Sequence, residues 1–226
     1  LMFSEFEGGA AARDQLQPAA PINKPDLVVT GIVEGETPST KAAVQALSAI
    51  SDRRNLLVVV ERDDDVDRLF LVVSRIFRAT LRSPRAAEGL GVSREDCFDY
   101  HSSARQLERV ADHAVKISTL ALKLDEIPED VAEALVALTE DAADVYEKAM
   151  DALFADESEE ANRLGHAARE AVLDIDEHTR TVDDMLRKLD PVQAQSLGLI
   201  VDSLSRSADY GGNIAETALQ KAAPRP

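Results

Sequence analysis

Two stretches, Leu107-Glu-Arg-Val-Ala-Asp-His-Ala-Val-Lys-Ile117 and Leu204-Ser-Arg-Ser-Ala-Asp-Tyr-Gly-Gly-Asn-Ile214, share one pattern and lie 97 positions apart. Each holds an Arg, an Asp three residues later, and apolar residues at helical spacing. Such a repeat indicates two copies of one helical unit, each with a carboxylate in the same place. The pattern therefore predicts a duplicated, acid-lined helical bundle.

The composition favours helices over sheets. Apolar residues make up 45% of the 226 residues, yet the chain has only six Phe, three Tyr and no Trp. Its core must therefore be built mainly from Ala, Leu, Val and Ile. Ala, Leu, Glu and Asp in this abundance suit packed helices, whereas sheets prefer aromatic and β-branched residues. We expect an all-α protein.

The net charge of −17 narrows the possible partners. So negative a surface repels nucleic acid and anionic lipid, so we expect no direct nucleic-acid binding. An excess of acid is typical of a salt-adapted cytoplasm, while a few carboxylates could still bind cations. The single Cys97 excludes an intrachain disulfide and fits a reducing cytoplasm, and we expect it to be buried. No apolar run is long enough to span a bilayer, so we expect a soluble, cytoplasmic protein without membrane insertion.

Periodicity and breakers divide the chain into six expected helices. Residues 1–36 form an irregular N-terminal lead-in, which could be a fragment of another domain. Leu56-Leu-Val-Val-Val60 alone resembles a buried strand, but the apolar spacing from Leu69 to Leu81 favours one long helix. Pro191 marks a helix start, and Ser93 with Asp96 forms a capping box. The helices are expected at about 38–50, 54–82, 94–124, 128–155, 158–189 and 191–221.

Three helices followed by three more predict two tandem antiparallel three-helix bundles. Short connections enforce the up-down order. The first repeat is expected to occupy 37–125 and the second 126–226.

At this point a resemblance to a known family becomes specific. Glu108-Arg-Val-Ala-Asp-His-Ala-Val-Lys-Ile117 resembles the Glu-Arg-Ile-Gly-Asp-x-x-x-x-Ile signature of the PhoU family of phosphate uptake regulators. The second copy of this signature is resembled by Arg206-Ser-Ala-Asp-Tyr-Gly-Gly-Asn-Ile214. The acidic start of the family's second helix is resembled by Glu61-Arg-Asp-Asp-Asp-Val-Asp67. The resemblance covers roughly residues 36–222. It implies two three-helix bundles and, with the acidic composition, a salt-adapted archaeal member.

The first repeat contains two acid pairs at one-turn spacing. Asp63 and Asp67 would share one helix face, as would Glu108 and Asp112. If the two helices pack with these faces adjoining, four hard oxygens suit Mg²⁺, Mn²⁺, iron or zinc. The family resemblance implies that these four residues bind metal. The alternative is a solvated ion-pair lattice around Arg109.

The second repeat departs from the pattern. Ser205 replaces the expected Glu, which leaves Asp209 without a one-turn partner. For the facing helix we prefer Glu170 and Asp174 over Asp176 and Arg180, because Leu173 is placed like Val66. Glu170, Asp174 and Asp209 are therefore the candidate ligands of a second, weaker metal site.

The resemblance implies a non-enzymatic regulator that negatively modulates a high-affinity phosphate transporter or phosphate-starvation signalling. Its implied partners are the transporter ATPase subunit, a sensor kinase and a second copy of the chain. No Gly-x-Ser-x-Gly, Walker loop, His-Glu-x-x-His or Glu-x-x-His motif suggests catalysis. The alternative is a histidine phosphotransfer or other metal-binding helical signalling module, with His101 or His113 as phosphoacceptor.

Overall fold

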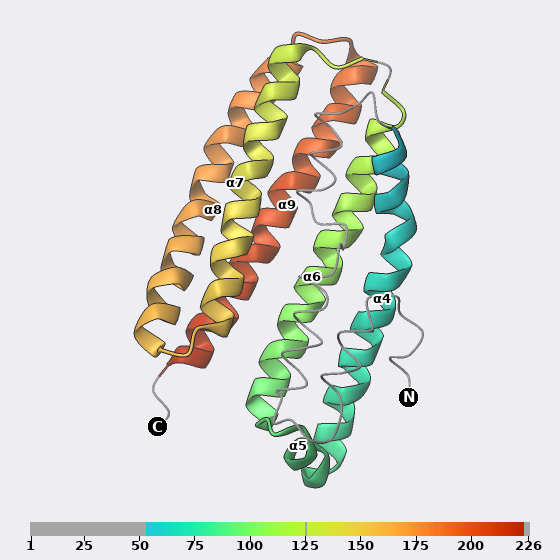
Figure 1. Ribbon diagram of the computed structural model, residues 1–226. Helices are drawn as coiled ribbons and strands as arrows, with labels where there is room; N and C mark the ends of the chain where they lie inside the picture. Colours follow the sequence, from blue (N-terminus) through green and yellow to red (C-terminus); the bar gives the residue numbers. More distant parts are fainter. Residues whose placement is uncertain (1–52, 125, 224–226) are drawn as a thin grey trace.

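The computed structural model describes residues 53–124 and 126–223, and these form helices without any strand. The lead-in at 1–36 and the expected helix at 38–50 lie outside the described residues. The expected long second helix is confirmed, so the strand reading of Leu56–Val60 is wrong. Figure 1 shows the helices in chain order: α4 Arg53–Arg82, α5 Pro84–Leu90, α6 Arg94–Ala121, α7 Glu129–Phe154, α8 Ser158–Leu186 and α9 Pro191–Ala222.

The start of α6 shows why the helix begins where the sequence predicted. The backbone N–H of Asp96 donates to Ser93 Oγ at 2.9 Å, and the Ser93 N–H donates to Asp96 Oδ2 at 3.3 Å. This reciprocal capping box satisfies two donors that a helix start leaves free. At α9, Pro191 takes the first helical position and Asp190 Oδ1 accepts from the Val192 N–H at 2.9 Å.

The short helix α5 was not predicted. We expected an irregular connection there, yet Pro84 opens a helix that Gly91 ends with φ of 71°. The Gly91 and Val92 N–H groups donate back to the carbonyls of Glu88 and Ala87 at 3.1 and 3.4 Å. Proline just inside a helix start and a left-handed glycine just after its end are the usual signals. They could have identified α5.

Helices α7, α8 and α9 pack on one another as a three-helix bundle, while α6 contacts both α4 and α9. The apolar spacing predicted for the first motif is confirmed in α6, where Ile117 is fully buried, and Leu135 and Leu153 of α7 are fully buried as well. Cys97 is also buried, as expected. Most of the largest fully buried side chains are Leu and Ile, in agreement with the predicted aliphatic core. Burial of this apolar surface is the main stabilising term for such a bundle.

Close helix contact depends on Gly211 in the second repeat. A Cβ there would lie 2.9 Å from Val145 Cγ1 and 3.4 Å from the backbone of Tyr146, so α9 can approach α7 only without a side chain. The first repeat has Ala114 at the matching position, and this Ala is fully buried. At this position the second copy thus has a smaller residue than the first.

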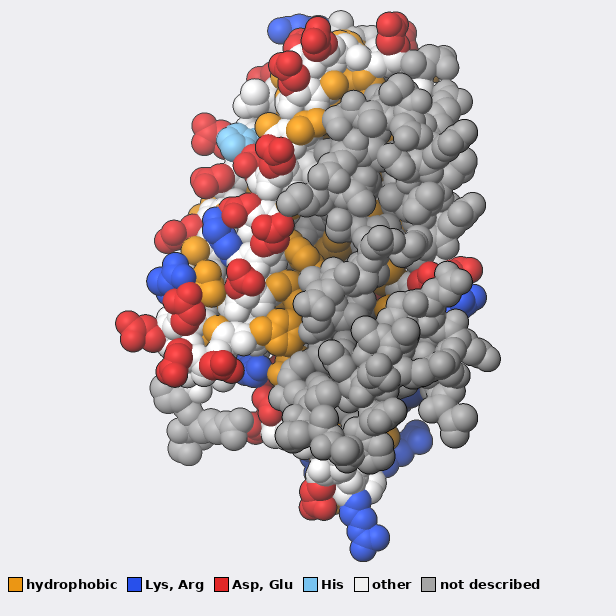
Figure 2. Space-filling model, in the orientation of Figure 1, with side chains coloured by type: hydrophobic (Ala, Val, Ile, Leu, Met, Phe, Trp, Pro, Cys, Tyr) orange, Lys and Arg blue, Asp and Glu red, His pale blue; other side chains and the backbone are white. Residues whose placement is uncertain are grey.

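The charged side chains lie mainly outside this core. Figure 2 shows Asp and Glu side chains spread over the face formed by α7 and α8, with a few basic groups among them. Several of the basic groups pair with an acid one turn earlier, as Arg163 does with Glu160 and Arg187 with Asp184. Exposed pairs of this kind add little stability. Within the described residues, no helix is both long and apolar enough to cross a membrane.

Candidate metal centre

Three of the four acids predicted in the first repeat converge between α4 and α6. Asp67, Glu108 and Asp112 can each place one carboxylate oxygen so that all three lie within 4.8 Å of one another. Asp67 and Asp112 are exposed and Glu108 is half-buried. We call these three residues the first carboxylate cluster. Within the described residues, they are the one group of three acidic, His or Cys side chains so arranged.

The antiparallel packing of α4 on α6 brings these acids together. Ser74 Oγ lies 3.2 Å from His101 Nε2, and the Arg105 guanidinium carbon lies 5.1 Å from the Phe70 ring centroid. This register places position 67 opposite Glu108 and position 63 opposite Asp112. One-turn spacing on each helix then directs both pairs to the same side.

Burial and repulsion from neighbouring carboxylates raise the pKa values of Asp63, Glu108 and Asp112. Burial raises the pKa of Glu108 most, and the carboxylates of Asp112 and Asp67 raise it further. The pKa of Asp112 is raised by burial and by Asp67, while Arg109 opposes the shift. Burial also raises the pKa of Asp63, with Asp112 and Asp67 as the next causes. Asp63 therefore belongs to the same electrostatic group, although it is not one of the three converging residues.

The donor set fits a hard cation. Crowded carboxylates disfavour one another's charge, and a bound cation would reverse that penalty. Three carboxylates offer up to six oxygens, so water could complete an octahedral shell around Mg²⁺ or Mn²⁺, and iron or zinc also accepts such oxygen ligands. No Cys or His belongs to the cluster. The donor set of the cluster thus suits a hard divalent or ferric ion better than a soft metal.

The second repeat does not assemble an equivalent cluster in the described residues. Burial raises the pKa of Asp209 most, Arg206 opposes that shift, and Asp176 and Asp202 add to it. Neither Glu170 nor Asp174 is among the charged neighbours of Asp209. The preference for Glu170 and Asp174 therefore receives no support from the geometry.

The rotation of α8 favours the other pair considered in the sequence, Asp176 and Arg180. Leu173 is 70% exposed, whereas Val66, which it was thought to match, is 2% exposed. A Cβ at Gly212 would contact Val172, so position 176 lies near the level of Asp209 and position 180 near Ser205. The geometric counterparts of Asp63 and Asp67 are thus Asp176 and Arg180. In the second repeat, the basic Arg180 therefore takes the place of Asp67, and the hydroxyl of Ser205 takes the place of the Glu108 carboxylate.

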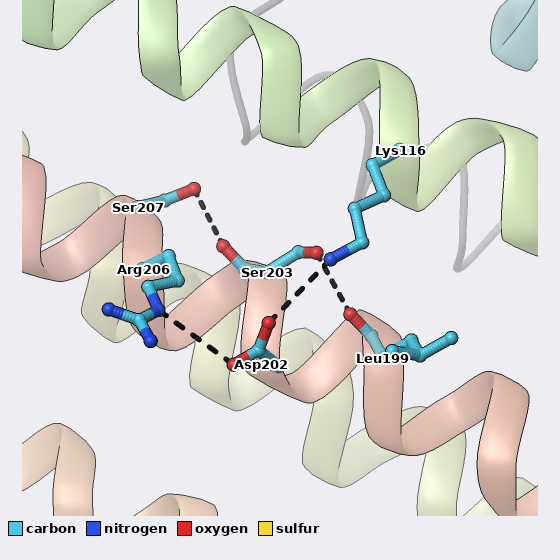
Figure 3. A network of polar contacts seen from close by, with 6 residues as sticks. All are labelled: Lys116, Leu199, Asp202, Ser203, Arg206 and Ser207. Atoms are coloured by element: carbon cyan, nitrogen blue, oxygen red, sulfur yellow. Dashed lines mark hydrogen bonds and ion pairs between the residues drawn. The ribbon is translucent and has the colours of Figure 1, made fainter.

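The two repeat motifs face each other across the contact between α6 and α9, which we call the seam. Lys116 Nζ lies 3.6 Å from Asp202 Oδ2 across the seam, and Arg206 Nε lies 3.8 Å from Asp202 Oδ1 along α9 (Figure 3). The hydroxyl of Ser203 donates to the Leu199 carbonyl at 2.8 Å (Figure 3). The pairing of Lys116 with Asp202 could not be predicted from the sequence, because it depends on the register between α6 and α9.

The polar contacts of the seam continue toward the first cluster. Asn213 Nδ2 lies 3.4 Å from Gln106 Oε1, and the Arg109 guanidinium carbon lies 5.5 Å from the Tyr210 ring centroid. His113 packs against the same ring at 5.6 Å between centroids. In each motif, the Asp side chain therefore faces the acids of its own repeat. The Arg side chain lies at the seam or beside it.

Both candidate phosphoacceptor histidines are packed among other side chains. The His101 ring is stacked on Phe77 at 4.6 Å and on Phe70 at 5.7 Å between centroids. The Nδ1 atom of His113 is buried without a hydrogen-bond partner. Burial is the largest cause of the lowered pKa of each imidazole. Neither ring is presented openly to a phosphodonor.

The fold and the cluster define an all-helical protein with a carboxylate centre between two helices. Residues 39–121 match the family model of the PhoU domain, so the chain contains a PhoU domain and the resemblance seen in the sequence is confirmed. The first carboxylate cluster lies entirely within the matched residues.

Solved structures of PhoU proteins share this fold. The chain is similar to PhoU from Pseudomonas aeruginosa with a TM-score of 0.63 and 22% identity, over 86% of this chain and 92% of that one. It is also similar to the phosphate transport system regulatory protein PhoU from Streptococcus pneumoniae, with a TM-score of 0.54 and 16% identity, over 86% and 87% of the two chains. These relatives give no support to the expected archaeal origin.

A second, shorter likeness is to large ribosomal subunit protein uL4. The chain is 58% identical over 38 residues to uL4 of Streptomyces avermitilis and 44% identical over 61 residues to uL4 of Cutibacterium acnes. These stretches make up 17% and 27% of this chain. The chain spans only 17% and 20% of the length of these curated relatives. The likeness is therefore local, whereas the PhoU fold extends over most of the chain.

Proposed function

We propose that this protein is a non-enzymatic regulator of phosphate uptake and phosphate homeostasis. It would act by negatively modulating a high-affinity phosphate transporter, phosphate-starvation signalling, or both, through protein contacts. The observation that carries the proposal is the PhoU domain at residues 39–121. The shared fold of the named PhoU structures supports it.

Asp67, Glu108 and Asp112 are the proposed metal ligands in this regulator, with Asp63 beside them. The convergence of three carboxylate oxygens supports this assignment. The ion would be Mg²⁺, Mn²⁺, zinc or iron, and it would relieve the repulsion between the acids. Asp209 would belong to a weaker second site at most, for which Asp176 is a better partner than Glu170 or Asp174.

The proposed partners are the ATPase subunit of the transporter, a sensor kinase, and a second copy of the chain in a homodimer. The protein would work in the cytoplasm, and we divide it into repeats at 37–125 and 126–226. The many acids on the face of α7 and α8 favour a partner surface with complementary basic groups (Figure 2).

A binding experiment with the transporter ATPase tests the regulatory role. At high phosphate, the immobilised wild-type chain should retain the ATPase subunit, and the Asp67→Ala/Asp112→Ala variant should retain less if metal organises the binding surface. The Glu88→Ala/Glu95→Ala variant, which removes two exposed acids from α5 and α6 outside the cluster and outside α7 and α8, is the control for lost charge. A wild-type chain that retains no ATPase at high or low phosphate would contradict this role.

The histidine phosphotransfer alternative has a separate test. Incubation with a small phosphodonor should leave no acid-labile phosphate on the protein, because both candidate rings are packed against neighbours. Phosphohistidine that forms on the wild-type chain but not on a His113→Gln variant would favour the relay.

A further inference from the structure

Arg109 lies beside the first carboxylate cluster but is not paired with it. It directly follows Glu108 and precedes Asp112 by three residues, a spacing at which helical side chains meet. Among the ion pairs of the described residues, however, none joins Arg109 to a carboxylate. Its charge still reaches the cluster, because it lowers the pKa of both Glu108 and Asp112. A competing cation is therefore held next to the proposed metal site.

Two contacts hold this guanidinium at the seam. Its carbon lies 5.5 Å from the Tyr210 ring centroid, within the range of a cation–π interaction. Its Nη1 donates to Gln106 Oε1 at 3.4 Å, and Asn213 Nδ2 reaches the same oxygen across the seam at 3.4 Å. Tyr210 lies on α9, in the other repeat, whereas Gln106 lies on α6 itself and is linked to α9 through Asn213.

Other arginines show what a different neighbour would do. Arg68, Arg163 and Arg187 each pair with an acid three residues earlier. Arg109 has a neutral Gln106 at that position, so its charge is not neutralised locally. Without the Tyr210 ring, the cluster acids would become its closest available counter-charges.

We propose that Tyr210 is a positioning residue for the metal centre: its ring, with Gln106 and Asn213, keeps the Arg109 guanidinium off the first carboxylate cluster and so leaves the cluster free for a cation. This inference rests on the proposed metal site. It makes metal affinity in the first repeat depend on a side chain of the second. By linkage, metal in the cluster would in turn favour the seam contacts of Arg109.

Calorimetric titration with Mn²⁺ tests the proposal. Tyr210→Leu should weaken Mn²⁺ binding roughly three- to tenfold, as expected for one positive charge moving against the cluster. Tyr210→Phe keeps the ring face and should bind within about twofold of wild type. Adding Arg109→Gln to Tyr210→Leu should restore the affinity. Gln106→Met, which removes the acceptor shared by Arg109 and Asn213 but leaves every side chain of α9 unchanged, should weaken binding in the same direction even if Tyr210→Leu fails to fold.

The outcomes separate this inference from the proposed site itself. If wild type binds Mn²⁺ and Asp67→Ala/Asp112→Ala does not, the site stands. Equal affinities for Tyr210→Leu, Gln106→Met and wild type would then overturn the role of Tyr210 alone. A loss in Tyr210→Leu that Arg109→Gln does not rescue would also overturn it. Absence of Mn²⁺ binding in wild type would overturn both.

Discussion

The two repeats place the same Arg-x-x-Asp motif in different electrostatic surroundings. In the first repeat, Asp112 meets Glu108 and Asp67, and three carboxylates converge. In the second, the charged neighbours of Asp209 are Asp176, Asp202 and Arg206. Ser205 occupies the position that matches Glu108. A duplicated fold therefore does not duplicate a site. The motif supplies one carboxylate, and the neighbouring positions decide whether a cation can bind.

The largest expected effect is the loss of metal from the first repeat. Asp112→Ala should weaken Mn²⁺ binding on the order of 100-fold, because it removes a charged ligand from a set of three. Asp209→Ala should leave the stoichiometry unchanged. Titration calorimetry on both variants measures the contrast, and a stronger effect at Asp209 would invert our comparison of the repeats.

The converse change should create a second site. Arg180→Asp with Ser205→Glu would give the second repeat the four acids found at the matching positions of the first. We expect a second equivalent of Mn²⁺, bound more weakly than the first because no other side chain there was selected to orient the ligands. Elemental analysis after equilibrium dialysis counts the ions. Ser205→Ala/Arg180→Ala is the control, and one equivalent in both variants would show that our register for α8 and α9 is wrong.

The difference between Gly211 and Ala114 at matching positions should appear in the free energy of unfolding of their variants. Gly211→Ala should lower the free energy of unfolding by about 1–3 kcal/mol, because its Cβ would press on Val145 and the backbone of Tyr146. At the matching position, Ala114→Gly should cost only about 1 kcal/mol, mainly through helix propensity. Urea unfolding followed by circular dichroism measures both. An unchanged free energy of unfolding in Gly211→Ala would mean that α9 and α7 can move apart without loss of stability.

A smaller effect concerns Asp99, an acid outside the first carboxylate cluster. It serves as a reference for an acid whose pKa is raised without being a proposed metal ligand. Burial raises its pKa from 3.8 to about 6, with Asp96 contributing and Lys221 opposing. The folded state thus binds this proton more tightly, so the associated stability is present below pH 4 and is lost as the pH rises through 6. Asp99→Asn should therefore stabilise the protein by about 1 kcal/mol at pH 7.5, after allowance for partial exposure, and little at pH 4.

Unfolding measured at the two pH values checks this prediction. An equal gain in the free energy of unfolding at pH 4 and pH 7.5 would show that the effect of Asp99→Asn is not linked to proton binding. A loss at pH 7.5 would mean that the ionised carboxylate is stabilising, with Lys221 as its partner.

The sequence predicted the features that depend on local pattern. Apolar spacing located α4, α6, α7, α8 and α9, and Ser93 and Pro191 marked two helix starts because capping is a short-range interaction. One-turn spacing was also enough to group Glu108 with Asp112.

The features that the sequence could not predict depend on how one helix is rotated against another. Glu170 and Asp174 satisfy the same one-turn rule, yet the exposure of Leu173 shows that their face is turned away from the core. The contact of Arg109 with Tyr210 joins residues about a hundred positions apart, and no local pattern encodes it. Sequence spacing gives the faces of a helix but not the register between helices.

Anomalous diffraction from crystals grown with Mn²⁺ would test the central claim most directly. Our account predicts a peak bounded by Asp67, Glu108 and Asp112, with Arg109 still over the Tyr210 ring, and no peak of similar height beside Asp209. A peak beside Asp209 alone, or a cluster without manganese at a saturating concentration, would contradict the assignment of metal binding to the first repeat.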